Sequence, residues 1–112
     1  MYQLMNEKLA VRYGVNTAFV ATLIWDGITL SECENVHYRN GRYWFRSSYN
    51  MFTAIYPFLT KSMVRTAVRK LMQKRVLVRG VFNHDPFDHT QWYTFTEYGR
   101  IMMRLCESED ED

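Results

Sequence analysis

Apolar and polar positions follow two patterns along the chain, one typical of helices and one typical of short strands. The helical pattern predicts helices over residues 6–13, from Asn16 through about Trp25, from Ser47 or Ser48 to about Tyr56, from Thr60 to about Lys74, and from Glu97 to about Cys106. The strand pattern predicts strands at Tyr43–Phe45, Val76–Phe82 and Trp92–Phe95. Helices and short strands in this order predict a mixed α+β domain.

The first two predicted helices meet at Gly14, a residue type that often ends a helix. Asn16 is a good N-cap for the second helix. The apolar residues after it are spread so broadly that this helix should be buried on much of its circumference. Asp26-Gly27 is expected to fray or kink it, and Asn40-Gly41 predicts a turn before the first strand.

The third and fourth predicted helices lie close enough to form a helix-turn-helix. Pro57 ends the third helix, because the residue before a proline avoids the helical region. Thr60 caps the fourth helix. We expect Phe58 and Leu59 to fill the angle between the two helices.

Two strands and a loop after these helices predict a wing. The loop runs from Asn83 to Thr90 and contains Pro86. The fold class is therefore predicted as α+β, a winged helix-turn-helix with extra N-terminal helices and a short C-terminal helix. We expect a single winged-helix domain over residues 1–106, followed by an acidic disordered tail over residues 107–112.

Composition supports one globular domain. The chain has 112 residues, of which 47% are hydrophobic and 23% are charged. Cys33 and Cys106 are too few for a disulfide framework, which favours the reducing cytosol. No targeting segment and no uninterrupted apolar run long enough to span a membrane is present, so we expect a cytoplasmic protein of a bacterial host.

The net charge of +2 conceals an uneven distribution. Residues 47–83 carry seven basic and no acidic side chains, whereas residues 107–112 carry five acidic ones. Without that tail, fourteen basic groups against seven acidic ones give a charge of +7. A concentrated basic segment in a compact domain is typical of a protein with a polyanionic partner, so double-stranded DNA is the expected partner.

The fourth predicted helix has one apolar and one polar face. Val64, Ala67, Val68 and Leu71 share an arc of about 100°, the usual width of a core-facing stripe. The opposite and flanking positions are the candidate DNA contacts Lys61, Ser62, Arg65, Thr66, Arg69, Lys70 and Gln73. The alternative is a helix with a merely solvated outer face. The absence of Asp and Glu across the helix counts against that alternative.

Residues 43–93 resemble the N-terminal winged-helix domain of phage replisome organisers and related DnaD-like replication proteins. The resemblance lies in Tyr43-Trp44, Ser48-Tyr49, Phe52, Tyr56-Pro57-Phe58, Arg65, Ala67 and Lys70-Leu71, and in the wing residues Gly80, Phe82-Asn83, Phe87-Asp88, Thr90 and Trp92-Tyr93. It implies a winged helix that binds DNA, with residues 60–74 as the recognition helix. It adds Asn83, His84, His89 and Gln91 as candidate wing contacts.

Two departures from that family matter. Similar proteins place Lys or Arg near positions 84, 89 and 91, where this chain has His84, His89 and Gln91, so strong contact between wing and phosphate is not expected. Replisome organisers also carry a second domain, and this chain is not expected to perform their whole role unaided.

No motif indicates an enzyme or a cofactor. The segment from His84 to His89 holds two histidines and two carboxylates that could supply metal ligands. Pro86 and the family resemblance explain the same segment as a wing turn, with Asp88 bonding nearby backbone groups. His37 is expected in a surface loop, and the two cysteines as ordinary packing residues.

The expected function is DNA binding in transcriptional regulation or replication, for a phage or mobile element. A homodimer through the N-terminal helices is expected, since many helix-turn-helix proteins read paired half-sites. The alternative is a monomer in which both helices pack on the wing core. The alternative function belongs to another class: an interaction protein, such as an anti-CRISPR or other inhibitor of host defence, that binds a protein partner with the same fold. The acidic tail and the neutral wing favour this alternative.

Overall fold

The computed structural model describes residues 7–110, with side chains up to Cys106. Helices α1 (Glu7–Tyr13) and α2 (Val15–Glu34) meet at Gly14, whose φ of 95° suits glycine. The predicted break between the two helices is confirmed. Helix α2 begins at Val15 with Gly14 in the cap position, so the predicted N-cap at Asn16 is wrong.

Helix α2 is the central element of the molecule and shows no break at Asp26-Gly27, contrary to prediction. A Cβ on Gly27 would lie 2.1 Å from the Phe45 ring, so this glycine permits close packing and does not mark a kink. The expected burial of this helix on much of its circumference is confirmed. Its buried residues are Thr17, Ala18, Val20, Ala21, Thr22, Leu23, Ile24 and Ser31.

A short hairpin follows α2, made of β1 (Tyr38–Arg39) and β2 (Arg42–Tyr43). Asn40 and Gly41 both have positive φ, 53° and 77°, which confirms the predicted turn and is typical of a two-residue hairpin. The strand predicted at 43–45 is divided. Tyr43 ends β2, and the next strand, β3, begins at Phe45.

The predicted helix-turn-helix is present as α3 (Tyr49–Ile55) and α4 (Lys61–Gln73), joined by a turn that contains Pro57. Thr60 caps α4 as predicted: its hydroxyl accepts a hydrogen bond from the Met63 amide at 3.1 Å. The predicted apolar stripe of α4 is confirmed. Its buried residues are Val64, Ala67, Val68 and Leu71.

The turn between α3 and α4 is filled by one residue of the two that we expected. Leu59 is buried, but Phe58 is 55% exposed. The Phe58 ring instead packs edge-on against Phe19 of α2, with ring centroids 5.0 Å apart. The turn therefore rests on α2 as well as on its own helices.

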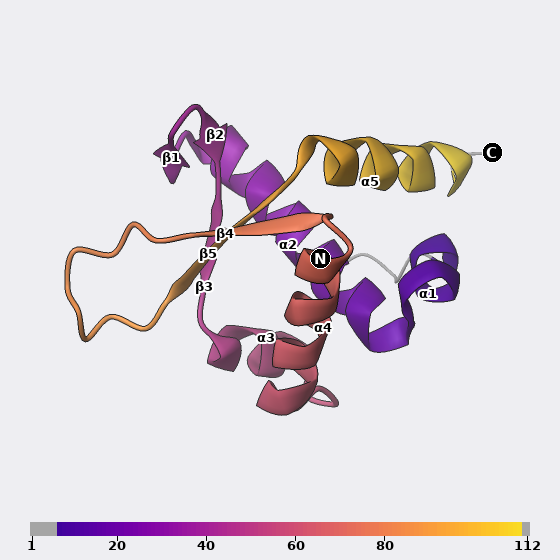
Figure 1. Cartoon of the computed structure of the whole chain (residues 1–112), viewed down its shortest axis with the longest axis horizontal. Coiled ribbons are helices and arrows are strands. Elements are labelled where there is room, and N and C mark those ends of the chain that lie inside the picture. Colours follow the sequence, from indigo (N-terminus) through magenta and orange to yellow (C-terminus); the bar gives the residue numbers. More distant parts are fainter. Residues whose placement is uncertain (1–6, 111–112) are drawn as a thin grey trace.

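The sheet has the strand order β3 (Phe45–Ser47), β5 (Gln91–Phe95), β4 (Leu77–Gly80), all antiparallel (Figure 1). The predicted wing is confirmed, because β4 and β5 pair from Leu77 and Phe95 to Gly80 and Trp92. The first strand ends at Gly80 and not at Phe82, since Val81 is 91% exposed at the start of the wing loop.

Helix α5 (Glu97–Asp110) closes the described chain. It passes its predicted end at Cys106, so the first four residues of the expected disordered tail are helical. Glu111 and Asp112 lie outside the described residues. Within residues 7–110, no helix is both long and apolar enough to cross a membrane.

Candidate nucleic-acid interface

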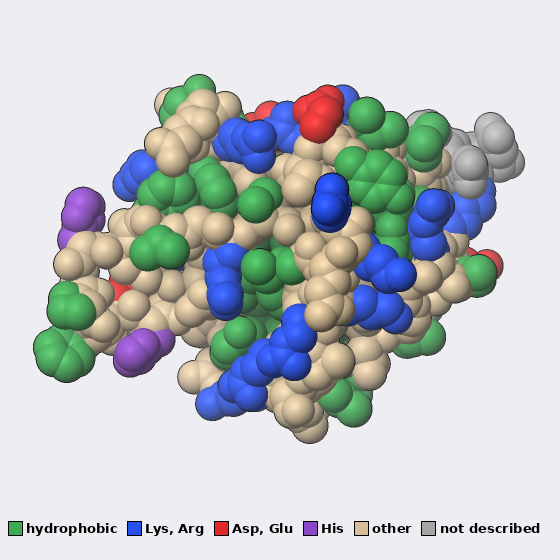
Figure 2. All heavy atoms as spheres, in the orientation of Figure 1, with side chains coloured by type: hydrophobic (Ala, Val, Ile, Leu, Met, Phe, Trp, Pro, Cys, Tyr) green, Lys and Arg blue, Asp and Glu red, His purple; other side chains and the backbone are tan. Residues whose placement is uncertain are grey.

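The outward face of α4 carries most of the residues predicted to contact DNA. Six of the seven candidate side chains are exposed, opposite the buried stripe: Lys61, Ser62, Arg65, Thr66, Arg69 and Gln73. Lys and Arg side chains gather over α4 and beside it on the face shown in Figure 2, with carboxylates toward the edges of that view. The structure brings these six residues to one surface, and their contact with DNA stays a prediction.

Lys70, the seventh candidate, lies elsewhere. It is half-buried, and its ammonium donates a hydrogen bond to the backbone carbonyl of Tyr13 at 2.7 Å. The carbonyl belongs to the last residue of α1, just before Gly14. Lys70 therefore ties α4 to the junction of α1 and α2, and its contact with DNA stays a prediction.

A cleft opens between α3, α4 and β4, with a volume of about 490 Å³. It is lined by Tyr49, Arg65, Val68, Arg69, Met72, Gln73 and Arg79. The lining includes three arginines and no carboxylate, so the cleft is strongly positive. An arginine fork matches the geometry of phosphate oxygens and of guanine.

Two of these arginines are held in place. The Arg65 guanidinium lies over the Tyr49 ring, 5.4 Å from its centroid. The Arg79 guanidinium donates a hydrogen bond to the Gln91 side-chain carbonyl at 3.2 Å. Sequence reasoning did not place Tyr49 or Arg79 in the site. The signal for Arg79 was a lone charge in an otherwise apolar strand.

Tyr93 lies opposite Arg79 in the pairing of β4 with β5 and is fully buried. Burial, and then the neighbouring Tyr49 phenol, raise the pKa of Tyr93 well above its usual range. Its hydroxyl thus stays neutral at every physiological pH. It adds no negative charge beside the arginine cleft.

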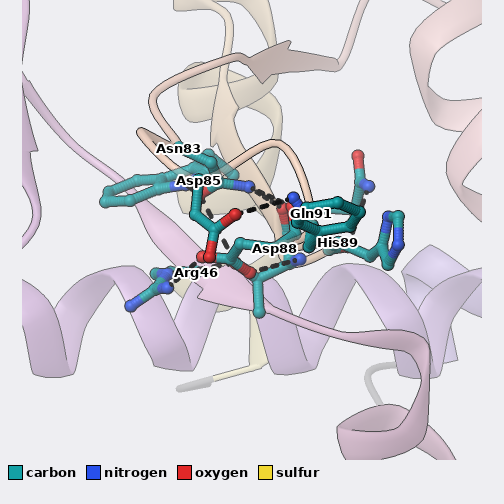
Figure 3. A network of polar contacts seen from close by, with 9 residues as sticks. Arg46, Asn83, Asp85, Asp88, His89 and Gln91 are labelled. Carbon is teal, nitrogen blue, oxygen red and sulfur yellow. Dashed lines mark hydrogen bonds and ion pairs between the residues drawn. The ribbon is translucent and has the colours of Figure 1, made fainter.

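Asn83 organises the inside of the wing loop (Figure 3). Its amide group donates hydrogen bonds to the carbonyls of Asp88 and Thr90, at 3.1 and 2.8 Å. Its side-chain oxygen accepts a hydrogen bond from the Trp92 indole at 2.7 Å. All of these contacts lie within the wing, so Asn83 has a structural role there, and its contact with DNA stays a prediction.

Asp88 ties the wing loop to β3. Its carboxylate accepts hydrogen bonds from the Thr90 amide at 3.0 Å and the Thr90 hydroxyl at 2.7 Å. It also pairs with the Arg46 guanidinium at 2.7 Å. The Thr90 bonds, and then Arg46, hold the pKa of Asp88 below its usual value. The predicted bonding of Asp88 to nearby backbone is confirmed.

The other predicted wing residues, Gln91, His84 and His89, differ in their hydrogen bonding and exposure. Gln91 is engaged inside the wing, since its amide donates to the His89 carbonyl at 3.1 Å while its oxygen accepts from Arg79. His84 and His89 are exposed. Within the described residues, no group of three His, Cys, Asp or Glu side chains could hold a metal ion.

The β1–β2 hairpin packs beside the base of the wing. His37 directly precedes this hairpin and was expected to be a surface loop residue. The His37 ring instead meets the Trp92 ring edge-on, with centroids 5.4 Å apart. Arg39 and Arg46 each lie 5.6 Å from the same ring. Burial, and then these two arginines, lower the pKa of His37.

No known family profile and no curated protein sequence matches this chain. Its backbone is similar to that of the transcriptional regulator YodB from B. subtilis. The diamide-treated form aligns with a TM-score of 0.59 and 15% identity over 97% of this chain and 92% of YodB. The reduced form aligns with a TM-score of 0.56 and 16% identity over 85% of this chain and 74% of YodB.

A third solved structure, the redox regulator HypR in its reduced form, aligns with a TM-score of 0.49 and 23% identity over 78% of this chain and 75% of HypR. The likeness to YodB confirms the predicted α+β winged-helix fold. It does not bear on replisome organisers, so that narrower resemblance stays a prediction.

Proposed function

We propose that this protein is a transcriptional regulator that binds double-stranded DNA through the outward face of α4. The observation that carries the proposal is the cleft beside that face, where Arg65, Arg69 and Arg79 meet without a carboxylate among the lining residues. The likeness of the fold to YodB, which is described as a transcriptional regulator, supports the same function.

The placement of the side chains suggests a division of roles along α4. Arg65, Arg69 and Gln73 line the cleft and are suited to hydrogen bonds with guanine and adenine edges in the major groove. Lys61 at the start of the helix and Arg79 on β4 are suited to phosphates. Unpaired backbone amides at the start of α4 favour a phosphate there as well.

The test is a binding titration with duplexes selected from a random-sequence pool, compared with unselected DNA. Arg69→Ala should lose about 1–3 kcal/mol on the selected duplex and relax its sequence preference. The matched control is Lys74→Ala, at the exposed C-terminal end of α4. Its affinity should fall equally for all sequences, with a salt slope smaller by about one. Absence of binding by the wild-type protein at low salt would refute the proposal.

The DNA-binding form is proposed to be a homodimer through the N-terminal helices. A groove of about 570 Å³ between α1 and α5 is lined by Glu7, Lys8, Val11, Arg12, Met102, Leu105 and Cys106. Val11 is 89% exposed, and a second copy would cover it. Light scattering should give the mass of a dimer for the wild type and of a monomer for Val11→Glu. The control is Val81→Glu, at a site 91% exposed on the wing, which should stay dimeric.

Two further roles remain as alternatives. The replisome-organiser resemblance implies replication of a phage or mobile element, which would use the same DNA-binding face. The interaction-protein alternative, of which an anti-CRISPR protein is an example, predicts a folded protein that binds no DNA even at low salt. The titration above separates this alternative from both DNA-binding roles.

A further inference from the structure

The wing ends in an exposed aromatic side chain. Phe87 is 83% exposed, in the loop that projects from the body of the molecule between β4 and β5 (Figure 1). A single exposed apolar residue is ordinary on a protein surface. This one is unusual because the backbone that carries it is fixed by hydrogen bonds on both sides.

The tip is a closed turn from Asp85 to Asp88. The Asp88 amide donates to the Asp85 carbonyl at 3.0 Å, and the Phe87 amide donates to the Asp85 carboxylate at 2.9 Å. Pro86 occupies the second position of the turn, where its fixed φ is favourable. Phe87 is therefore presented by a preorganised turn and has little freedom to fold back on the body.

The carboxylates of the turn are both engaged. Asp85 accepts from the Phe87 amide, and Asp88 pairs with Arg46. The Arg46 guanidinium offsets the charge of Asp88, whereas the exposed Asp85 carboxylate keeps its negative charge while it accepts from the Phe87 amide. Arg79 and Gln91 connect the base of the same wing to the arginine cleft of α4. The wing thus extends from the edge of the proposed DNA-binding face.

The shape of the tip decides which partner it fits. A specific protein interface buries roughly 800 Å² on each side, far more than one projecting ring offers. The minor groove of duplex DNA is only about 6 Å wide, and narrow apolar side chains can enter it and wedge between base pairs. A narrow apolar protrusion at the rim of a positive surface matches this second partner.

We infer that Phe87 is an apolar wedge with which the wing enters the minor groove of duplex DNA beside the α4 contact. The inference rests on the proposed DNA-binding function and adds a second, non-ionic contact to it. It also explains how a wing that lacks Lys and Arg between residues 80 and 92 can contribute to affinity. Because a wedge displaces no counterions, its contribution should not depend on salt.

The experiment uses the full-length protein and a duplex selected from a random-sequence pool, with 2-aminopurine replacing adenines across the protected site. Phe87→Ala should lose about tenfold in affinity at every salt concentration, with an unchanged salt slope. Phe87→Leu should retain most of the affinity. Wild-type protein should brighten 2-aminopurine at one step through unstacking, and Phe87→Ala should not. Ile101→Ala, an exposed apolar residue of α5, is the matched control and should behave as wild type.

The outcomes separate this inference from the function on which it rests. If Phe87→Ala binds and brightens the probe as wild type does, while Arg69→Ala loses affinity, the wedge is refuted and DNA binding stands. A Phe87→Ala variant with normal DNA binding and an altered oligomeric mass would make the tip a protein contact, which also refutes the wedge. If wild-type protein binds no duplex at low salt, both the function and the wedge are refuted.

Discussion

The helix-turn-helix and the wing present their candidate contacts by different physical means. Helix α4 is oriented by four buried apolar side chains that pack against the core. The wing loop is held by hydrogen bonds that the Asn83 amide group donates and the Asp88 carboxylate accepts, and by the ion pair between Asp88 and Arg46 of β3. Apolar packing thus orients the arginines, whereas a polar network orients the apolar tip.

This difference sets how each region should respond to change. Burial of apolar area is shared across the whole core, so a defect in α4 lowers the stability of the entire domain. The hydrogen bonds of the wing lie within one loop and its neighbouring strand. Their loss should open the loop locally while the rest of the molecule stays folded.

The largest effect is expected in the core under α4. Leu71 is fully buried, so Leu71→Ala should cost about 2–5 kcal/mol in the free energy of unfolding. For a domain of this size that lowers Tm by roughly 8–20 °C in a calorimetric scan. Gln73→Ala, an exposed position on the same helix, is the control and should leave Tm nearly unchanged. A Leu71→Ala protein with unchanged Tm would contradict the assigned core face.

The same difference explains which parts could be predicted from the sequence. The spacing of Val64, Ala67, Val68 and Leu71 carries the helical period and predicted α4 and its buried face correctly. Thr60 predicted the cap. The turn at Asn40-Gly41 was also predictable, because its backbone conformation depends on two adjacent residues. Each of these features is local along the chain.

Features that depend on distant residues were not predictable in this way. Lys70 matched the basic outer face by type, but its partner is the Tyr13 carbonyl, 57 positions away in sequence. Gly27 was predicted to break the helix, but a small residue is needed there because the Phe45 ring packs against it. The local sequence does not show that contact. Asn83 was predicted as a DNA contact, but its side chain bonds residues of its own wing loop. No periodic pattern in the sequence describes the conformation of that loop.

Lys70 gives the next largest effect and separates stability from binding. Lys70→Met keeps the aliphatic length and removes the hydrogen bond to the Tyr13 carbonyl, which should cost about 1–3 kcal/mol. Thermal unfolding should therefore shift downward, while DNA affinity measured below the transition changes little. Arg69→Ala, at the adjacent exposed residue, should instead lose DNA affinity and leave the thermal unfolding transition nearly unchanged. Equal losses of DNA affinity in both variants would show that Lys70 also contacts DNA.

Asn83 tests the wing alone. Asn83→Ala removes bonds to the Asp88 and Thr90 carbonyls and to the Trp92 indole. Each such bond is worth about 0.5–1.5 kcal/mol. Hydrogen exchange should quicken in residues 81–90 and at the Trp92 indole, with protection in α4 retained. Thr53→Ala on α3 serves as control, because its hydroxyl bonds only within its own helix. Loss of protection in α4 would show that the two regions unfold together.

The smallest expected effect is the response of the wing to acid. The Thr90 hydrogen bonds, and then Arg46, lower the pKa of Asp88, so the folded wing favours the ionised carboxylate. This stabilisation is complete above the pKa of about 3.9 that Asp has in an unfolded chain, and it is lost as pH falls through the lower folded value. The Trp92 indole proton, bonded to Asn83, should therefore exchange faster on acidification before α4 loses protection. In Asp88→Asn the wing should already be looser at pH 7 and should lack this added acid response. An identical pH profile in wild type and Asp88→Asn would mean that another group controls the opening of the wing.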